Sequence, residues 1–167
     1  ENVVVDHCTS TWGVKENQSI GHQTDRTTFT NCLIAEGLRD SIHYKGERAF
    51  GTLVGDEAER VALFGNLWAH HHQWTPRLKD HTRVALSNNV RSHYDGGVEV
   101  EAAARATVEG DVFVRPTGGR PDLYGEGAVY AADNDYRSDD DRRRVAHGLR
   151  ELPDRPCWPA GFERLPV

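Results

Sequence analysis

The sequence predicts an all-β chain that folds as a parallel β-helix with about 22 residues per coil. Short segments of alternating apolar residues recur along the chain, each followed by a polar residue, at 3–8, 28–32, 61–66, 84–88 and 128–133. A period near 22 is too short for a β-α-β unit, whose crossover alone takes ten or more residues. Hairpin signals between the segments are missing, which disfavours an antiparallel sandwich. Coils stacked strand on parallel strand satisfy both observations.

The polar residues after the strands align the coils. His7, Asn31, Asn66, Asn88 and Asp133 are separated by 24, 35, 22 and 45 positions. The second spacing is one turn plus an insertion, and the last is close to two turns, with the segment 111–114 midway. Asparagine tolerates the left-handed backbone of a tight bend, so we expect stacked asparagines at these corners.

The same alignment predicts which side chains point inward. Cys8 and Cys32 occupy equivalent positions, and we expect both to point into the stack. Trp12 and Trp68 fall within the repeat pattern, which favours core or ladder packing over sugar stacking for both. Three cysteines without a C-x-x-C pair exclude a disulfide scaffold and a cysteine-rich zinc module, and they predict free thiols.

We divide the chain into β-helix coils over 1–138 and a C-terminal tail over 139–167. A loop insertion near 36–59 interrupts the coils and carries Lys45 and Arg48, and insertions of this kind often form the binding face of a solenoid. The charge run at 139–144 (DDDRRR) predicts a solvated turn or helix start. The proline-rich tail is expected to pack across the outside or the end of the stack.

Charge and hydropathy exclude two classes of partner. The chain carries 26 acidic and 20 basic side chains, and this net charge of -6 offers no basic footprint for nucleic acid. No apolar run approaches the roughly 20 residues that a membrane helix needs. Because the sequence begins at Glu1 and contains no methionine, we expect a processed chain or a fragment.

Several motifs resemble those of pectate lyase-like proteins. The stretch VVDHCTSTWG at 4–13, followed by Glu16-Asn17 and Ser19-Ile20, is similar to the DHCS-SWG-DEN-SI block of that family. Further matches follow in order and spacing at 34–38, 41–47, Gly51, 66–71, 76–78, Val84 and 88–90. The chain thus resembles polysaccharide lyase family 1, bacterial branch, strongly over residues 2–95 and more weakly beyond them.

This resemblance implies a right-handed parallel β-helix in a secreted, extracellular protein, which we expect to be a monomer. It also implies cleavage of an acidic polysaccharide such as pectate by β-elimination, usually with calcium. That reaction removes a weakly acidic proton beside a carboxylate, so a site must neutralise the carboxylate and place a base on the proton. Calcium requires several oxygen ligands, so the resemblance predicts clustered carboxylates on one face.

The sequence departs from the family at the proton acceptor. The family has an arginine two residues before the proline, and that arginine is held to take the proton. Here this position is Trp74, which can neither accept a proton nor hold a carboxylate by charge. Arg77 matches a second family arginine, and Lys79 stands where a further substrate-binding cation is common. The resemblance therefore retains a cationic clamp while the expected base is absent.

The calcium site implied by the resemblance is incomplete in this sequence. Glu16 matches the metal-binding glutamate of the family by position. The aspartate expected about four residues later falls at Ser19 or Ile20, and neither can replace it. The family's remaining acidic ligands precede the strand equivalent to residues 2–7. Calcium is therefore a cofactor for which Glu16 is the one candidate ligand.

Other candidate site residues allow a functional and a structural interpretation. Lys45 and Arg48 either bind substrate carboxylates or are solvated loop charges. The run His70-His71-His72 suggests zinc, but alternation along a strand sends neighbours to opposite faces, so a turn with exposed histidines is favoured and His71 is assigned to substrate binding. Trp74, beside Arg77, is suited to stacking on a sugar ring.

Three functions remain open. In the first, the chain cleaves an acidic polysaccharide, with Arg77 clamping the uronate and Lys45 or a histidine acting as base. In the second, it is a non-catalytic relative in which Trp74 stacks on sugar while Arg77 and Lys79 attract carboxylates. In the third, it is a truncated β-helix that associates through exposed strand edges. Family resemblance favours the lyase over the other two.

Overall fold

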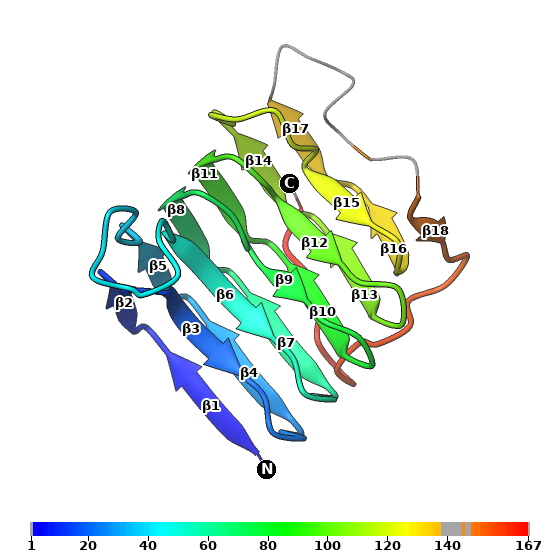
Figure 1. Ribbon diagram of the computed structural model, residues 1–167. Helices are drawn as coiled ribbons and strands as arrows, with labels where there is room; N and C mark the ends of the chain where they lie inside the picture. The colour runs from blue at the N-terminus through cyan, green and yellow to red at the C-terminus, as the bar shows by residue number, and fades with distance from the viewer. Residues whose placement is uncertain (1, 138–144, 146–147, 167) are drawn as a thin grey trace.

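The computed structural model describes residues 2–137, 145 and 148–166, and over these residues the chain is a parallel β-solenoid of three sheets. Strands of successive coils stack in parallel register, about 6 turns in all with roughly 23 residues per turn (Figure 1). No helix occurs among the described residues, and none is therefore long and apolar enough to cross a membrane. The predicted fold class is confirmed.

The first five coils each contribute one strand to each sheet in chain order, and the described residues of the later coils add β16, β17 and β18. The first sheet contains β1 (Val3–Asp6), β4 (Thr27–Thr30), β7 (Val61–Phe64), β10 (Arg83–Ser87), β13 (Arg105–Glu109), β16 (Ala128–Ala132) and β18 (Arg150–Glu151). The second contains β2 (Thr9–Thr11), β5 (Leu33–Ala35), β8 (Leu67–His71), β11 (Val90–Tyr94), β14 (Val112–Val114) and β17 (Asp135–Arg137). The third contains β3 (Glu16–Ile20), β6 (Phe50–Val54), β9 (Arg77–Leu78), β12 (Val98–Val100) and β15 (Leu123–Gly125).

Sharp corners between the first and second sheets keep each coil short. One residue per coil adopts a left-handed backbone there, with φ between 52° and 69°, at His7, Asn31, Gly65, Asn88, Gly110 and Asp133. Asparagine and glycine reach this conformation at least cost, and two of the six positions are Asn and two are Gly. The predicted left-handed asparagines are thus present at Asn31 and Asn88.

The alignment of Asn66 with Asn31 was wrong by one residue. Leu67 pairs with Leu33, so Gly65 is equivalent to Asn31 and Asn66 is equivalent to Cys32. Asn66 is buried and begins a column of polar side chains inside the corner. Its Oδ1 accepts a hydrogen bond from the Cys32 backbone amide at 2.9 Å. In the next coil Asn88 occupies the left-handed corner and Asn89 the buried column, so asparagine occurs at both positions. The residue type alone therefore could not show which of the two positions Asn66 occupies.

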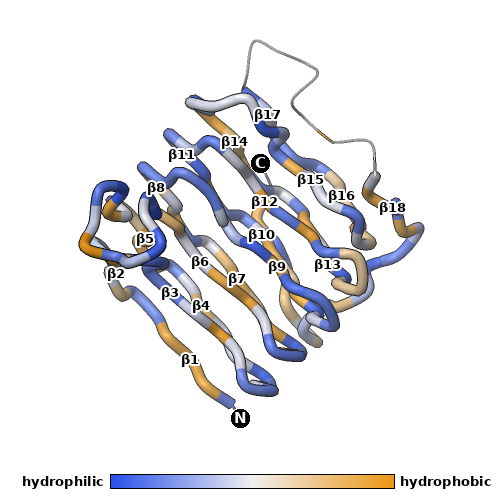
Figure 2. Tube along the Cα trace, in the orientation of Figure 1, coloured by the Kyte–Doolittle hydropathy of each residue, from blue (hydrophilic) through white to orange (hydrophobic). Residues whose placement is uncertain are grey.

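The core lies between the three sheets and is filled by side chains at equivalent positions of successive coils. The column on the second sheet contains Ile34, Trp68, Arg91 and Phe113, all fully buried. Figure 2 shows apolar residues along strands of the first sheet, such as β1 and β7, and polar residues at the turns. Trp68 packs inside as predicted, whereas Trp12 is 69% exposed just after β2 and does not pack in the core.

The three cysteines are free thiols, as predicted. Cys32 is buried, and its thiol lies 3.2 Å from the Thr30 carbonyl oxygen. Cys8 is exposed, so the expectation that it also points into the stack is wrong. Cys32, at the equivalent position of the second coil, has a coil stacked on each side. Cys8 lies in the first described coil, and within the described residues a coil is stacked on one side of it.

Two irregular segments depart from the coil pattern. The region expected as an insertion at 36–59 comprises a long loop at 36–49, then β6 and the turn that leads to β7. In the tail, the segment 152–166 lies along the outer face of the first sheet, where Trp158 and Phe162 pack against Phe64 (Figure 1, red). The charge run at 139–144 lies outside the described residues.

Candidate functional site

Most of the predicted site residues lie on or beside the outer face of the third sheet. Arg77 occupies β9, Trp74 precedes that strand and Lys79 follows it. The long loop at 36–49 leads directly into β6 and carries Lys45 and Arg48. Parallel stacking therefore brings the loop that precedes β6 next to the segment that precedes β9 in the following coil.

A column of cations and aromatic rings runs across this face. The Phe50 and Trp74 rings stack at 3.9 Å between centroids, with an interplanar angle of 24°. The Arg48 guanidinium lies over Phe50 at 5.6 Å, and the Arg77 guanidinium lies over Trp74 at 5.2 Å. Much of the indole surface is therefore covered by protein, and a sugar ring that stacked there would compete with these contacts.

Carboxylates of the following coil hold Arg77. Its Nε donates to Glu101 Oε1 at 2.8 Å, and its terminal nitrogen lies 2.6 Å from the same oxygen. A second carboxylate, that of Glu99, lies 3.7 Å from Nε. Glu99 is the register partner of Arg77 on β12, and the Tyr124 hydroxyl donates to it at 3.4 Å. The predicted uronate clamp thus has two protein carboxylates beside its guanidinium.

The sequence reasoning did not single out Phe50, Glu99 or Glu101. The repeat period could have predicted the two glutamates. Glu99 stands 22 positions after Arg77, and a parallel stack places residues one period apart side by side. To predict that Phe50 stacks on Trp74, one must know how β6 aligns with the next coil after the long loop, and the sequence pattern does not provide that alignment.

Three cations on this side have no carboxylate partner among the described residues. Arg48 donates to the backbone carbonyl of Glu47 at 2.7 Å, and Lys45 Nζ lies 5.4 Å from the Tyr44 ring centroid. The Lys79 side chain crosses Gly55, where an added Cβ would lie 3.0 Å from Lys79 Cδ. No ion pair involves Lys45, Arg48 or Lys79 within the part of the chain that the structure describes.

Glu16 does not assemble a calcium site. Lys15 Nζ lies 3.1 Å from both of its carboxylate oxygens, so the carboxylate already has a cationic partner. Within the described residues no three acidic, histidine or cysteine side chains are grouped so that they could hold a metal ion. The residues present therefore do not fit the calcium ion that the resemblance implied, and no step is assigned to it.

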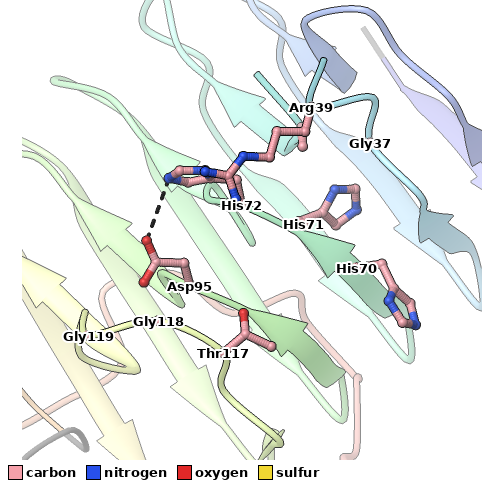
Figure 3. A pocket seen from close by; sticks show the side chains of 10 residues that line it. Gly37, Arg39, His70, His71, His72, Asp95, Thr117, Gly118 and Gly119 are labelled. Atoms are coloured by element: carbon pink, nitrogen blue, oxygen red, sulfur yellow. Dashed lines mark ion pairs between the residues drawn. The ribbon is translucent and has the colours of Figure 1, made fainter. Parts of the chain in front are cut away.

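The three consecutive histidines point in different directions because the backbone bends at His70, whose φ of 58° is left-handed (Figure 3). Simple alternation from the buried Trp68 would have left His71 outside. His71 points inward and is 3% exposed, whereas His70 and His72 point outward. His71 Nε2 lies 3.0 Å from the Ile34 carbonyl oxygen, and burial lowers the pKa of His71 to about 4. His71 is thus buried and does not lie on the outer face that carries Arg77, and its predicted role in substrate binding stays a prediction.

The loop histidine His43 has cationic surroundings. Partial desolvation and the charges of Arg48, Lys15 and Lys45 lower its pKa. Its ring stacks on Tyr44 at 4.8 Å, and its Nδ1 accepts a hydrogen bond from the Lys45 amide at 3.2 Å. A neutral imidazole surrounded by cations is the kind of group that can accept a proton next to a bound anion.

The chain is thus a parallel β-solenoid with Trp74, Arg77 and Lys79 on or beside the outer face of its third sheet. No protein-family model matches the chain. Over 97 residues, or 58% of this chain, it is 31% identical to the protein called probable pectate lyase C in Aspergillus flavus, and to the protein of the same name in Aspergillus oryzae. The match covers 21% of each of those proteins. The chain is thus distantly and partially similar to a pectate lyase.

Proposed function

We propose that the third sheet and the 36–49 loop bind an acidic, uronate-containing polysaccharide outside the cell without cleaving it. The observation that carries this proposal is Trp74. It occupies the position of the family's proton acceptor, and it is packed between Phe50 and Arg77 rather than left free. The similarity to proteins named pectate lyase supports the class of ligand.

In this proposal the polysaccharide is bound by the three cations that have no carboxylate partner among the described residues. Arg48 lies over Phe50, Lys79 follows β9 and crosses Gly55, and Lys45 lies beside Tyr44 in the loop that leads into β6. The polymer that they would contact carries one carboxylate per uronate unit. A single exposed ion pair contributes about 0.2–1 kcal/mol and is screened by salt, so one cation is insufficient. Several cations that contact successive units of one chain add their contributions, because the later contacts form at high effective concentration.

The absence of cleavage follows from the groups around Arg77. An indole has one N–H donor and no acceptor, so Trp74 cannot remove a proton. The Glu101 carboxylate occupies Arg77 Nε, and Glu99 lies beside it. A uronate carboxylate approaching Arg77 would meet both of these negative charges, and the clamp is weaker for that reason.

Eliminative cleavage is the second candidate function, and His43 is the observation that favours it. The loop holds this imidazole, with its lowered pKa, among Lys15, Lys45 and Arg48. In that case Lys45 and Arg48 neutralise the uronate carboxylate, and the neutral His43 imidazole removes the adjacent proton.

Near-ultraviolet absorbance during incubation with polygalacturonate separates the two functions, because elimination creates an unsaturated sugar at the new chain end. We expect no increase for the native chain, with calcium or with chelator. We also expect none for Trp74→Arg, since Glu101 still holds Arg77. An increase for the native chain that is lost in His43→Gln would establish the second function in place of the first.

Binding is tested with a triple variant, Lys45→Gln with Arg48→Gln and Lys79→Gln, and a charge-matched control, Arg105→Gln with Arg137→Gln and Arg150→Gln. The control residues lie on the first and second sheets. We expect the first variant to lose affinity for polygalacturonate about tenfold or more and the control to lose much less. Equal losses in both would show that net charge, rather than this face, governs the interaction.

A further inference from the structure

Five strands of the first sheet begin at an arginine or directly after one, on the side of the stack where the turns from the third sheet arrive (Figure 1). Parallel register stacks these positions at about 4.8 Å per coil. We call this set of residues the arginine column. Its members are Arg26, Arg60, Arg83, Arg105 and Arg150, with Ala128 in the coil between the last two.

The first members of the arginine column are paired with carboxylates from the position that precedes them in each coil. Asp25 forms ion pairs with Arg26 and Arg60, and Glu59 lies 3.7 Å from Arg83 Nε. Asp25 and Glu59 are themselves register partners. In the next two coils the same position is occupied by uncharged residues, Thr82 and Ala104. The carboxylates that compensate the column therefore end beside Arg83.

The last two arginines of the column lack such compensation. Arg105 and Arg150 are exposed, and neither makes a side-chain hydrogen bond or ion pair with another residue in the part of the chain that the structure describes. Arg105 is the register partner of Arg83, and like charges at paired positions destabilise a sheet. Ala128 carries only a methyl group, so no long side chain separates Arg105 from Arg150. An anion from outside the chain would relieve this repulsion.

A pocket of about 340 Å³ lies at the same end of the column. Arg83, Arg105 and Arg150 line it together with His81 and Glu59, and the turn at 102–104 adds three alanines. Three guanidiniums thus share the pocket with one carboxylate, which already lies beside Arg83. Ligand pockets commonly enclose about 300–1,000 Å³, so this volume suits a compact group.

The geometry of guanidinium groups favours a tetrahedral oxyanion in this pocket. A guanidinium donates two parallel N–H···O bonds to a pair of oxygens, and it does so with phosphate as well as with carboxylate. A carboxylate offers one such pair, which a single arginine occupies. A phosphate or sulfate group has three or four oxygens, so it can accept from arginines of different coils at once.

We propose that this pocket binds a phosphate or sulfate group, held between Arg105 and Arg150 with Arg83 contributing from the adjacent coil. Glu59 then remains the partner of Arg83 on the side away from the anion. The pocket belongs to the first sheet and its turns, whereas the cations assigned to a uronate polymer belong to the third sheet and its loop. The inference therefore does not depend on the proposed function of that face.

Nitrogen-15 NMR of the arginine Nε–H groups tests the proposal on the native chain. The chain is titrated separately with sodium phosphate, sodium sulfate and sodium galacturonate, at an ionic strength kept constant with sodium chloride so that screening does not change. We expect phosphate, sulfate or both to shift the Arg105 and Arg150 resonances in a saturable way, and galacturonate to bind about tenfold more weakly or less well still. No saturable shift with either oxyanion, or equal affinity for galacturonate, would overturn the proposal.

Two double variants separate the pocket from net charge. Arg105→Gln with Arg150→Gln should weaken binding of the responding anion about tenfold or more, with the Arg83 resonance as the reporter. Arg115→Gln with Arg137→Gln makes the same change in charge at exposed positions outside the pocket and should bind as the native chain does. The first variant should melt at a temperature no lower than the native chain, because it removes repulsion and no described contact. Equal affinity of the two folded variants would contradict the assigned site.

Discussion

Trp74 contributes packing at a position where the resembling family has a charge. Its ring contacts Phe50 of the preceding coil at 3.9 Å, and the Arg77 guanidinium lies over it at 5.2 Å. Aromatic pairs and cation–π contacts of this kind contribute about 0.5–1.5 kcal/mol each. The same side chain therefore stabilises the third sheet, at the position where the resemblance implied a proton acceptor.

His71 shows how burial alters the chemistry of one residue. The folded chain holds the pKa of His71 at about 4, because burial penalises the charged imidazolium, whereas the ordinary value is 6.5. The unfolded chain thus binds a proton between pH 6.5 and about 4 where the folded chain does not. Stability must then rise with pH through this window, and fall as pH decreases through it.

We expect the free energy of unfolding of the native chain to fall by about 2 kcal/mol from pH 7 to pH 5 because of His71. His71→Gln removes the titration and keeps an N–H donor for the Ile34 carbonyl, so its stability should change less over the same interval. Urea unfolding of both chains at the two pH values measures the difference. The same pH dependence in both chains would show that other groups account for it.

The corner between the first and second sheets contains a continuous ladder of side-chain hydrogen bonds. Each Oδ1 of Asn66, Asn89, Asp111 and Asn134 accepts from the backbone amide one coil earlier, at 2.8–2.9 Å. The amide nitrogens of the three asparagines donate to backbone carbonyls of the first sheet. The ladder thus satisfies polar groups that the sharp corner removes from the sheets.

Asp111 differs from its neighbours in the ladder because it pairs with an arginine inside the core. Arg91 and Asp111 are both fully buried and lie 2.7 Å apart, and the guanidinium also lies over the rings of Trp68 and Phe113. Burial raises the pKa of Asp111, and the charge of Arg91 opposes that effect. A buried pair of this kind is costly to break but is often replaceable by apolar groups.

Asp111→Asn is expected to lower the free energy of unfolding by about 3–5 kcal/mol, because it leaves a buried guanidinium without its carboxylate. Adding Arg91→Met should restore most of that loss, since an asparagine at 111 can continue the ladder as it does at Asn89. Chemical denaturation of the single and double variants measures both effects. A double variant no more stable than Asp111→Asn would show that the ion pair is not the source of the loss.

The C-terminal segment 152–166 attaches to the first sheet by packing and by charge. Phe162 stacks on Phe64 at 4.0 Å, and Trp158 packs on both rings. The Glu109 carboxylate accepts hydrogen bonds from Arg155 and Arg164, each at 2.7 Å. The segment therefore covers an apolar strip of strands β7 and β10 that would otherwise face solvent.

We expect Phe162→Ala to lower the free energy of unfolding by about 2 kcal/mol, through the loss of buried aromatic area and of the stacked contact. Leu165→Ala, at a side chain that is 70% exposed, is the control and should change stability by less than about 0.5 kcal/mol. Thermal unfolding compares the two. Limited proteolysis after residue 152 should become faster in Phe162→Ala alone, and equal rates would contradict the packing account.

The stack of coils was predictable because its signal is repeated. Alternating apolar strands and a period near 22 were enough to give the parallel solenoid, and the structure has roughly 23 residues per turn. The exact register was not predictable across the corner at Asn66, because adjacent positions there tolerate the same residue types. Cys8 and Trp12 were placed inward by the repeat, and both are exposed in the first described coil, where one neighbouring coil is described.

The functional roles assigned to the candidate site residues stay predictions, and the structure shows where these residues lie. Trp74, Arg77 and Lys79 lie on or beside the third sheet, and the loop of Lys45 and Arg48 leads into β6 of the same sheet. The partners that alter their chemistry come from other coils, as with Glu101, which is 24 positions after Arg77. Side-chain pairing across coils depends on rotamers and register together, which a linear pattern does not contain.

Isothermal titration calorimetry with polygalacturonate is the most direct test of the central claim, because a single trace reports both binding and turnover. We predict a saturable binding heat that weakens as salt is raised, with the signal returning to baseline after every injection. A heat signal that continues after each injection, with an unsaturated product in the cell, would contradict binding without cleavage. The absence of any binding heat at low salt would contradict the assignment of this face to an acidic polysaccharide.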